Sequence, residues 1–225
     1  MVMNTPVSGA AAAGIPTRGI PAAALAAAGI TAMPAARLTT GHAALDALLG
    51  GGWPAGMLTE LLVPRQCGAE LGLLTPALAA LTGTGRWVLL IAPPWIPYAP
   101  GLAWQGVAPE RVLIVRARQP LDALWAMEEA LRSGSCAAVI AWTGCRDLPR
   151  TARVLLQRLH LLAGRQSAWG VLVRPARVRR ERSPARLRLE LLSATPATLR
   201  VEVFRNGCPG ATGQGTGEVT VERRH

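Results

Sequence analysis

The chain has 225 residues, of which 24 are basic and 13 are acidic, so its formal net charge is +11. All 24 basic residues are arginine and none is lysine, which excludes a Schiff-base enzyme and a P-loop with its lysine. Half of the residues are apolar, a share typical of a folded chain that buries a core without disulfides or metals.

Residues 1–36 consist mainly of Ala, Gly and Pro and hold little apolar volume. Such a segment forms no core of its own, and we interpret it as an N-terminal arm. A short docking helix is the alternative, with Leu25, Ile30 and Met33 as its contact residues. We assign residues 37–222 to the core and 223–225 to a tail.

Beyond residue 37, apolar segments with helical and strand spacing alternate along the chain. The predicted helices are 41–49, 71–81, 120–131 and 149–163, the last one ending before Gly164. The predicted strands are 57–63, 87–92, 112–115, 137–142 and 169–173. Three further short segments, 187–192, 199–204 and 219–221, predict an antiparallel meander at the edge of the sheet. Together they predict an α/β fold with a mainly parallel sheet flanked by helices.

The four cysteines and three histidines lie far apart in the sequence and form no metal-binding pattern. We therefore expect no metal and no disulfide framework, and reduced cysteines in a cytoplasmic protein. The uncharged stretch 87–109 contains five prolines. These would break a membrane-spanning helix, so we expect no membrane contact.

Several motifs resemble the segment that precedes the P-loop in RecA-type recombinases. They are Leu38-Thr39-Thr40-Gly41, Ala44-Leu45-Asp46, Leu49-Gly50-Gly51-Gly52, Pro54, Gly56 and Glu60, and the late run Leu199–Asn206 matches as well. Within that superfamily, the Gly-Gly-Gly-Trp-Pro-x-Gly and Leu-Thr-Glu-Leu motifs most resemble the ImuA family of RecA-like and SulA-like accessory proteins. The resemblance covers residues 38–222 and implies a RecA-like core.

The catalytic motifs of a RecA-type ATPase are missing. In the P-loop pattern G-x-x-x-x-G-K-[ST], the chain has Val63 for the first glycine, Gly68 for the second, Ala69 for the lysine and Glu70 for the hydroxyl residue. The second strand ends without the catalytic glutamate, and the strand that should end in a magnesium-binding aspartate ends in Trp142. We predict a pseudo-ATPase without cofactor and not an enzyme. An active ATPase with an atypical loop is the alternative.

Residues 174–186 contain six arginines and a single acid. In the RecA-like order this segment follows the fifth strand, where the resemblance implies a contact with single-stranded DNA. Arginine binds phosphate oxygens through paired hydrogen bonds. We predict a mobile nucleic-acid-binding loop, and a solvated loop without a ligand is the alternative. Its candidate residues are Arg174, Arg177, Arg179, Arg180, Arg182 and Arg186.

Most of the seven tryptophans, including Trp125, are expected in the core. Trp95, Tyr98 and Trp104 lie in a proline-rich stretch and are predicted to be exposed partner-binding residues. The resemblance implies that the partners are ImuB, RecA and an error-prone polymerase subunit.

The resemblance implies a non-catalytic accessory protein of SOS-induced translesion repair that acts by binding ImuB- or RecA-type partners, and contact with single-stranded DNA through the arginine-rich loop is a secondary hypothesis. The alternative is a SulA-type division inhibitor that binds the tubulin-like division protein.

Overall fold

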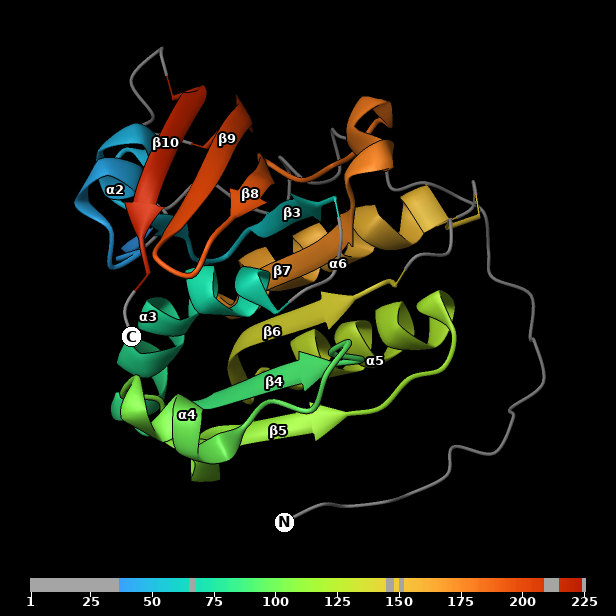
Figure 1. Cartoon of the computed structure of the whole chain (residues 1–225). Coiled ribbons are helices and arrows are strands. Elements are labelled where there is room, and N and C mark those ends of the chain that lie inside the picture. The colour runs from blue at the N-terminus through green and yellow to red at the C-terminus, as the bar shows by residue number, and fades with distance from the viewer. Residues whose placement is uncertain (1–36, 65–67, 145–147, 150–151, 209–214, 224–225) are drawn as a thin grey trace, which may run out of the picture. The chain divides into compact units, whose positions relative to one another are not determined.

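The computed structural model of the chain describes residues 37–64, 68–144, 148–149, 152–208 and 215–223 (Figure 1). Its main feature is an eight-stranded sheet in the order β10-β9-β8-β3-β7-β6-β4-β5. These strands are β3 (Leu58–Val63), β4 (Trp87–Ile91), β5 (Val112–Val115), β6 (Cys136–Trp142), β7 (Trp169–Pro175), β8 (Leu187–Ala194), β9 (Thr198–Asn206) and β10 (Gly217–Glu222). The predicted mixed α/β fold with a mostly parallel sheet is confirmed.

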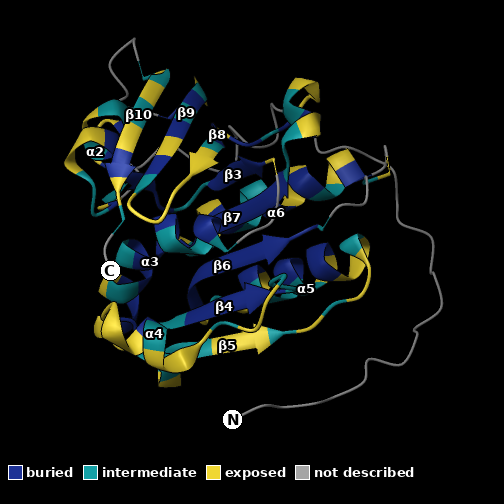
Figure 2. Ribbon diagram, viewed as in Figure 1, coloured by how far each residue is buried: buried dark blue, intermediate teal, exposed yellow. Residues whose placement is uncertain are grey.

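The central strands form because their sequences are apolar at nearly every position. All six residues of β3 and all seven of β6 are buried, as expected for parallel strands covered on both faces. Figure 2 shows β3, β4, β6 and β7 mainly buried, whereas the edge strand β5 is largely exposed.

Helices cover both faces of this sheet. Helix α3 (Ala69–Gly83) packs on one face together with α2 (Ala43–Leu49). Helices α5 (Pro120–Ser133) and α6 (Ala152–Gln166) pack on the other face. Successive residues of β4 alternate between the two cores, with Leu90 in the first and Leu89 in the second. This alternation is the period of two that a buried strand requires.

A small antiparallel pair precedes the main sheet. It joins β1 (Arg37–Leu38) to β2 (Trp53–Pro54), and the run Gly50–Gly52 turns the chain between α2 and β2. Gly52 has a φ of 117°, and a Cβ at this position would lie 2.2 Å from the carbonyl oxygen of Leu38. Glycine is therefore required there for conformation and for space.

The C-terminal segments form the predicted antiparallel meander, in which β9 pairs with β8 on one side and with β10 on the other. The meander is also part of the main sheet, because β8 pairs in parallel with β3. Within that sheet, β9 is therefore the strand that is antiparallel to the others.

The end of helix α6 differs from the prediction. The helix runs through Gly164 to Gln166, and the chain leaves it at Ser167, which adopts a positive φ of 50°. Glycine at position 164 therefore does not end the helix, although a residue after a helix in this conformation is usually glycine.

The proline-rich stretch contains helix α4 (Ala99–Trp104), followed by the 3-10 helix η1 (Pro109–Arg111). Neither helix was expected from the sequence, because both are too short to show a helical period. No described helix has the length and apolar character needed to cross a membrane.

Candidate functional site

The degenerate P-loop lies at the junction of β3 and α3. Val63 is the last residue of β3, and Gly68, with a φ of 82°, directly precedes α3. Ala69 and Glu70 form the first turn of the helix and are both buried. The strand, turn and helix therefore stand in the expected order, although residues 65–67 lie outside the described part.

The positions that would hold magnesium in an ATPase contact each other here. The indole Nε1 of Trp142, at the end of β6, donates a hydrogen bond to Oε1 of Glu70 across 3.3 Å. Both side chains are almost completely buried. An indole offers no lone pair to a metal, and a carboxylate at this helix start repels a triphosphate. The residues present do not fit a magnesium–nucleotide group.

Other metal sites are absent from the described residues, since no three His, Cys, Asp or Glu side chains there are grouped to hold an ion. The cysteines Cys136 and Cys208 are free and buried. Burial raises the pKa of both thiols. Burial and the charge of Arg186 lower the pKa of His160, whose Nδ1 accepts a hydrogen bond from the backbone N–H of Leu58.

A buried carboxylate, Glu60 in the middle of β3, organises the segment that follows β7. Its Oε1 accepts hydrogen bonds from Ser183 Oγ at 2.8 Å and from Arg174 Nη1 at 3.3 Å. Its Oε2 accepts a hydrogen bond from Arg188 Nε at 2.7 Å. Glu60 is fully buried, and the two arginines are 2% and 5% exposed. One carboxylate thus joins β3, β7, β8 and the connection between the last two.

Arg188 extends this network to the backbone of the arginine-rich segment. Its guanidinium donates hydrogen bonds to the carbonyl oxygens of Val178, Arg179 and Glu181. Residues 176–180 form the 3-10 helix η2 (Ala176–Arg180), whose Val178 is buried. The segment is therefore not the mobile loop that the sequence predicted, because a buried charge network holds its backbone in place.

The structure also corrects the predicted set of nucleic-acid contacts. Arg174 is buried and pairs with Glu60 and Glu181. Arg179 pairs with Glu190 and Glu202, and its guanidinium stacks on Phe204.

Hydrogen bonds between Arg179 and Glu202 raise the pKa of the arginine and lower the pKa of the glutamate. Both Arg174 and Arg179 therefore serve internal ion pairs, and neither offers an uncompensated charge to a phosphate.

The other four predicted arginines remain at the surface. Arg177, Arg180, Arg182 and Arg186 are exposed and lie in the connection from β7 to β8. Arg177 and Arg180 follow the carboxyl end of β7, the end of a parallel sheet where loops of α/β proteins bind ligands. Arg186 directly precedes β8, whose first residue pairs near the amino end of β3. We refer to these four side chains as the arginine surface.

A second exposed group lies between β4 and the end of α4. The exposed fractions are 67% for Trp95, 71% for Ile96, 74% for Tyr98 and 81% for Trp104. The predicted exposure of Trp95, Tyr98 and Trp104 is confirmed, and we refer to these four residues as the aromatic surface. The other predicted partner residues, Leu25, Ile30 and Met33, lie outside the described part.

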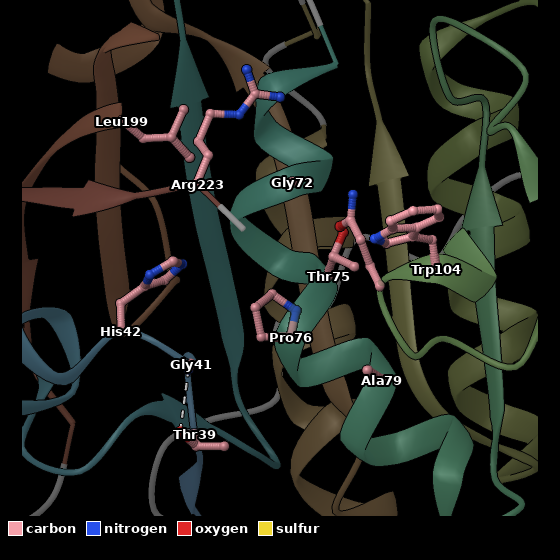
Figure 3. A pocket seen from close by; sticks show the side chains of 11 residues that line it. Thr39, Gly41, His42, Gly72, Thr75, Pro76, Ala79, Trp104, Leu199 and Arg223 are labelled. Atoms are coloured by element: carbon pink, nitrogen blue, oxygen red, sulfur yellow. Dashed lines mark hydrogen bonds between the residues drawn. The ribbon is translucent and has the colours of Figure 1, made fainter. Parts of the chain in front are cut away.

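A cavity of about 400 Å³ lies beside α3 (Figure 3). Its lining comes from the segment before α2, one face of α3, the end of α4, β9 and Arg223, which follows β10. Two of its polar side chains are engaged within the protein, since Arg223 donates to the carbonyl of Thr195 and Thr75 donates to that of Leu71. Among the described residues that line it, no set of catalytic groups converges.

The sequence did not predict the role of Glu60 and its partners. An acid in the middle of an otherwise apolar strand was the available signal, because a buried charge requires a partner. Arg188 stands between Leu187 and Leu189 in the same way. The partners themselves are 114 to 128 residues away in the chain, and no local pattern connects them.

A family model and several relatives all point to the same protein family. Residues 56–158 match the family model described as cell division inhibitor SulA. The protein of that name from Yersinia enterocolitica is 30% identical over 121 residues, which are 54% of this chain and 69% of the relative. Those from Yersinia pestis and Yersinia pseudotuberculosis are 29% identical over the same length.

The fold and these matches define a SulA-like α/β protein. The chain belongs to the family of the cell division inhibitor SulA. The SulA-like part of the predicted resemblance is thereby confirmed. The matched stretch contains the aromatic surface, whereas the arginine surface and strands β8 to β10 lie beyond the family model.

Replacing Glu60 tests the buried network. Glu60→Ala removes the buried carboxylate that Arg174 and Arg188 share, and we expect the free energy of unfolding to fall by about 3–5 kcal/mol. As the matched control, Glu218→Ala removes an exposed carboxylate paired with Arg200 and should cost at most about 1 kcal/mol. Urea denaturation followed by circular dichroism measures both, and equal losses would contradict the assigned role of Glu60. If Glu60→Ala does not fold, Glu60→Gln takes its place.

Proposed function

We propose that this chain is a non-catalytic accessory protein of SOS-induced translesion DNA repair, of the ImuA type, that works by binding other macromolecules. The observation that carries the non-catalytic part is the Glu70–Trp142 hydrogen bond. Two bulky side chains fill the positions where an ATPase holds magnesium. We therefore assign the function to contacts made by the protein's surface.

Two features support a RecA-like origin of the scaffold. The P-loop position lies between β3 and α3, and β3 is flanked by β7 and β8, both parallel to it, in the middle of the sheet. The run Leu199–Asn206, which resembles RecA-type proteins, lies in β9 of the same sheet. Strands β8 and β9 belong to the same folded unit as the SulA-like region, residues 56–158, and lie beyond it in the sequence.

The two surfaces suit different partners. The aromatic surface presents large apolar side chains, which are the usual anchors of protein interfaces, and we assign to it the ImuB- or RecA-type partners and the polymerase subunit. The arginine surface carries positive charge suited to single-stranded DNA. It contains no aromatic residue for base stacking, so we expect binding that depends on charge and is indifferent to sequence.

A division inhibitor is the second candidate function, and the names of the relatives favour it. The aromatic surface lies within the matched region and would serve such a role equally well. The translesion role is preferred because the arginine surface and strands β8 to β10 lie beyond the residues that match the SulA family model. The relative is the shorter protein, since the same 121 residues are 69% of it and 54% of this chain.

Nucleotide binding tests the non-catalytic proposal. Isothermal titration of the purified chain with magnesium-ATP should show no saturable heat, because Glu70 and Trp142 occupy the metal position and Glu70 repels the phosphates. Release of phosphate should equal that of buffer alone. Saturable, magnesium-dependent binding would contradict the proposal, and an intact P-loop ATPase titrated in parallel shows that the assay detects binding.

Single-stranded DNA binding tests the arginine surface. The double variant Arg180→Ser and Arg182→Ser should bind a labelled oligonucleotide more weakly, with the salt slope of log K reduced by about 0.7 for each phosphate that the variant no longer neutralises. The matched control is Arg86→Ser with Arg165→Ser, which removes two exposed arginines at the opposite end of the strands. Fluorescence anisotropy measures both variants, and equal affinities would remove DNA from the proposed function.

Two cellular readouts separate the candidate functions. In the cell that naturally carries this chain, deletion should lower the frequency of damage-induced mutation, and overexpression should leave cell length unchanged. Filamentous cells on overexpression with unchanged mutation frequency would instead support the division inhibitor. Replacing Trp95 and Trp104 by Ala should abolish whichever effect is seen, since either role uses the aromatic surface.

A further inference from the structure

Trp125 and the cavity beside α3 are two features without a role in the proposed function. Trp125 was expected in the core, but the structure places it on the outer side of α5, where it is 54% exposed. The charges near it serve internal ion pairs, because Glu128 binds both Arg132 and Arg158. The cavity differs in this respect, since its lining combines apolar groups with a charge that has no acidic partner among the lining residues.

The floor of this cavity is the side of α3 that faces away from the sheet. Gly72, Pro76 and Ala79 lie on it, each one helical turn from the next. All three are half-buried. A Cβ on Gly72 would have Nη2 of Arg223 as its nearest neighbour, at 3.9 Å. The space above the helix is therefore open, and the volume of about 400 Å³ is in the range of ligand-binding pockets.

Pro76 leaves a backbone acceptor on this floor. Proline has no N–H, so the carbonyl oxygen of Gly72 lacks the hydrogen bond that residue 76 donates in a regular helix. Gly72 and Pro76 both line the cavity, so this oxygen lies at its floor. A carbonyl that loses its helical donor favours a replacement, and an N–H group of a ligand can supply it.

Arg223 supplies a donor and a permanent positive charge. Its backbone N–H donates to the carbonyl of Ala197 and its Nη1 donates to that of Thr195, so the turn between β8 and β9 anchors the residue at both ends. Its Nη2 lies over Gly72. No carboxylate in the part of the chain that the structure describes forms an ion pair with Arg223, and the described lining contains no acid. The cavity therefore holds one uncompensated charge in a fixed position.

The opposite wall of the cavity is apolar. Figure 3 shows Trp104 and Arg223 on different sides of α3. The width of a helix, about 10 Å, therefore lies between them. Trp104 is 81% exposed, so its indole extends the cavity onto the surface of the protein. A ligand that contacts both residues is elongated, with an anionic end and an apolar end.

We propose that this cavity binds a short acidic and apolar segment of a protein partner. A carboxylate of the segment pairs with Arg223, an apolar side chain contacts Trp104 and Ala79, and a main-chain N–H donates to the carbonyl oxygen of Gly72. An extended chain advances about 3.3 Å per residue. The acidic and the apolar residue are therefore about three positions apart.

Charge complementarity selects a carboxylate over a phosphate. A single guanidinium matches the single charge of a carboxylate. A phosphate is better served by several cations or by the free N–H groups of a helix N-terminus, and the floor of this cavity is the middle of α3. The indole of Trp104 lies mostly outside the cavity, so it would contact a segment that continues along the surface rather than a small molecule.

This inference rests on the proposed function in one respect, which is that a protein partner contacts the aromatic surface, since Trp104 belongs to both. The test uses only the purified chain and a synthetic peptide. Loss of peptide binding and loss of the cellular role are therefore separate results. If the peptide binds as expected while deletion of the chain leaves damage-induced mutation unchanged, the proposed function fails and the peptide site stands.

Nuclear magnetic resonance titration of the isotope-labelled full chain with the peptide acetyl-Asp-Ala-Ala-Leu-amide tests the site. The indole Nε1–H signal of Trp104 and the side-chain amide signals of Gln105 should shift and saturate. We expect a dissociation constant between about 0.1 and about 1 mM, since one charge-assisted contact and one apolar side chain carry the binding. The peptide with Asn in place of Asp should bind at least about tenfold more weakly. Acetate alone should cause no saturable shift.

Three variants change the site and leave the core intact. Arg223→Ser removes the charge and should weaken binding at least about tenfold. Gly72→Leu fills the floor and should abolish binding without lowering the stability, because leucine favours a helix more than glycine does. Pro76→Ala returns a donor to the carbonyl of Gly72, so it should weaken binding severalfold while raising the midpoint of thermal unfolding. The matched control Arg200→Ser removes an exposed arginine of the meander outside the cavity and should leave the dissociation constant unchanged.

Three outcomes would overturn the peptide site. They are the absence of a saturable shift at Trp104, equal affinities of the Asp and Asn peptides, and equal affinities of Arg223→Ser and the wild type. Saturable shifts with acetate or thymidine monophosphate but not with the peptide would overturn it as well, because they indicate a site for a free anion.

Discussion

A carboxylate buried between two arginines determines how the C-terminal third of this chain joins the sheet. Glu60 and Arg188 are direct partners in the pairing of β3 with β8, so their ion pair lies across neighbouring strands. A shift of β8 by one residue would turn Arg188 to the other face of the sheet and leave Glu60 buried without this partner. The ion pair thus favours a single register, which apolar contacts alone would specify less strictly.

The same network explains why an arginine-rich segment has a fixed backbone. Arg188 donates three hydrogen bonds to carbonyl oxygens of residues 178–181. Those carbonyls would otherwise need water, and the buried guanidinium would otherwise lack acceptors. The segment is therefore preorganised, and ordering it on a ligand costs little conformational entropy. This distinguishes it from a flexible basic tail, whose affinity is reduced by such a cost.

The sequence predicted the parallel strands well because their apolar runs and the helices between them have clear periods. It did not predict that β8 would lie parallel to β3, because periodicity reports burial and not strand direction. Arg174 and Arg179 were misassigned for a related reason. An arginine that pairs with a distant glutamate looks the same in sequence as one that faces solvent. The outward position of Trp125 was in principle readable, since Leu124 and Met127 define the buried side of its helix.

The surfaces that remain exposed lie on different parts of the fold. The aromatic surface follows β4, and the arginine surface lies in the connection from β7 to β8. The scaffold whose magnesium position is filled by Glu70 and Trp142 therefore exposes two surfaces of different chemistry, one aromatic and one basic, on separate parts of the fold.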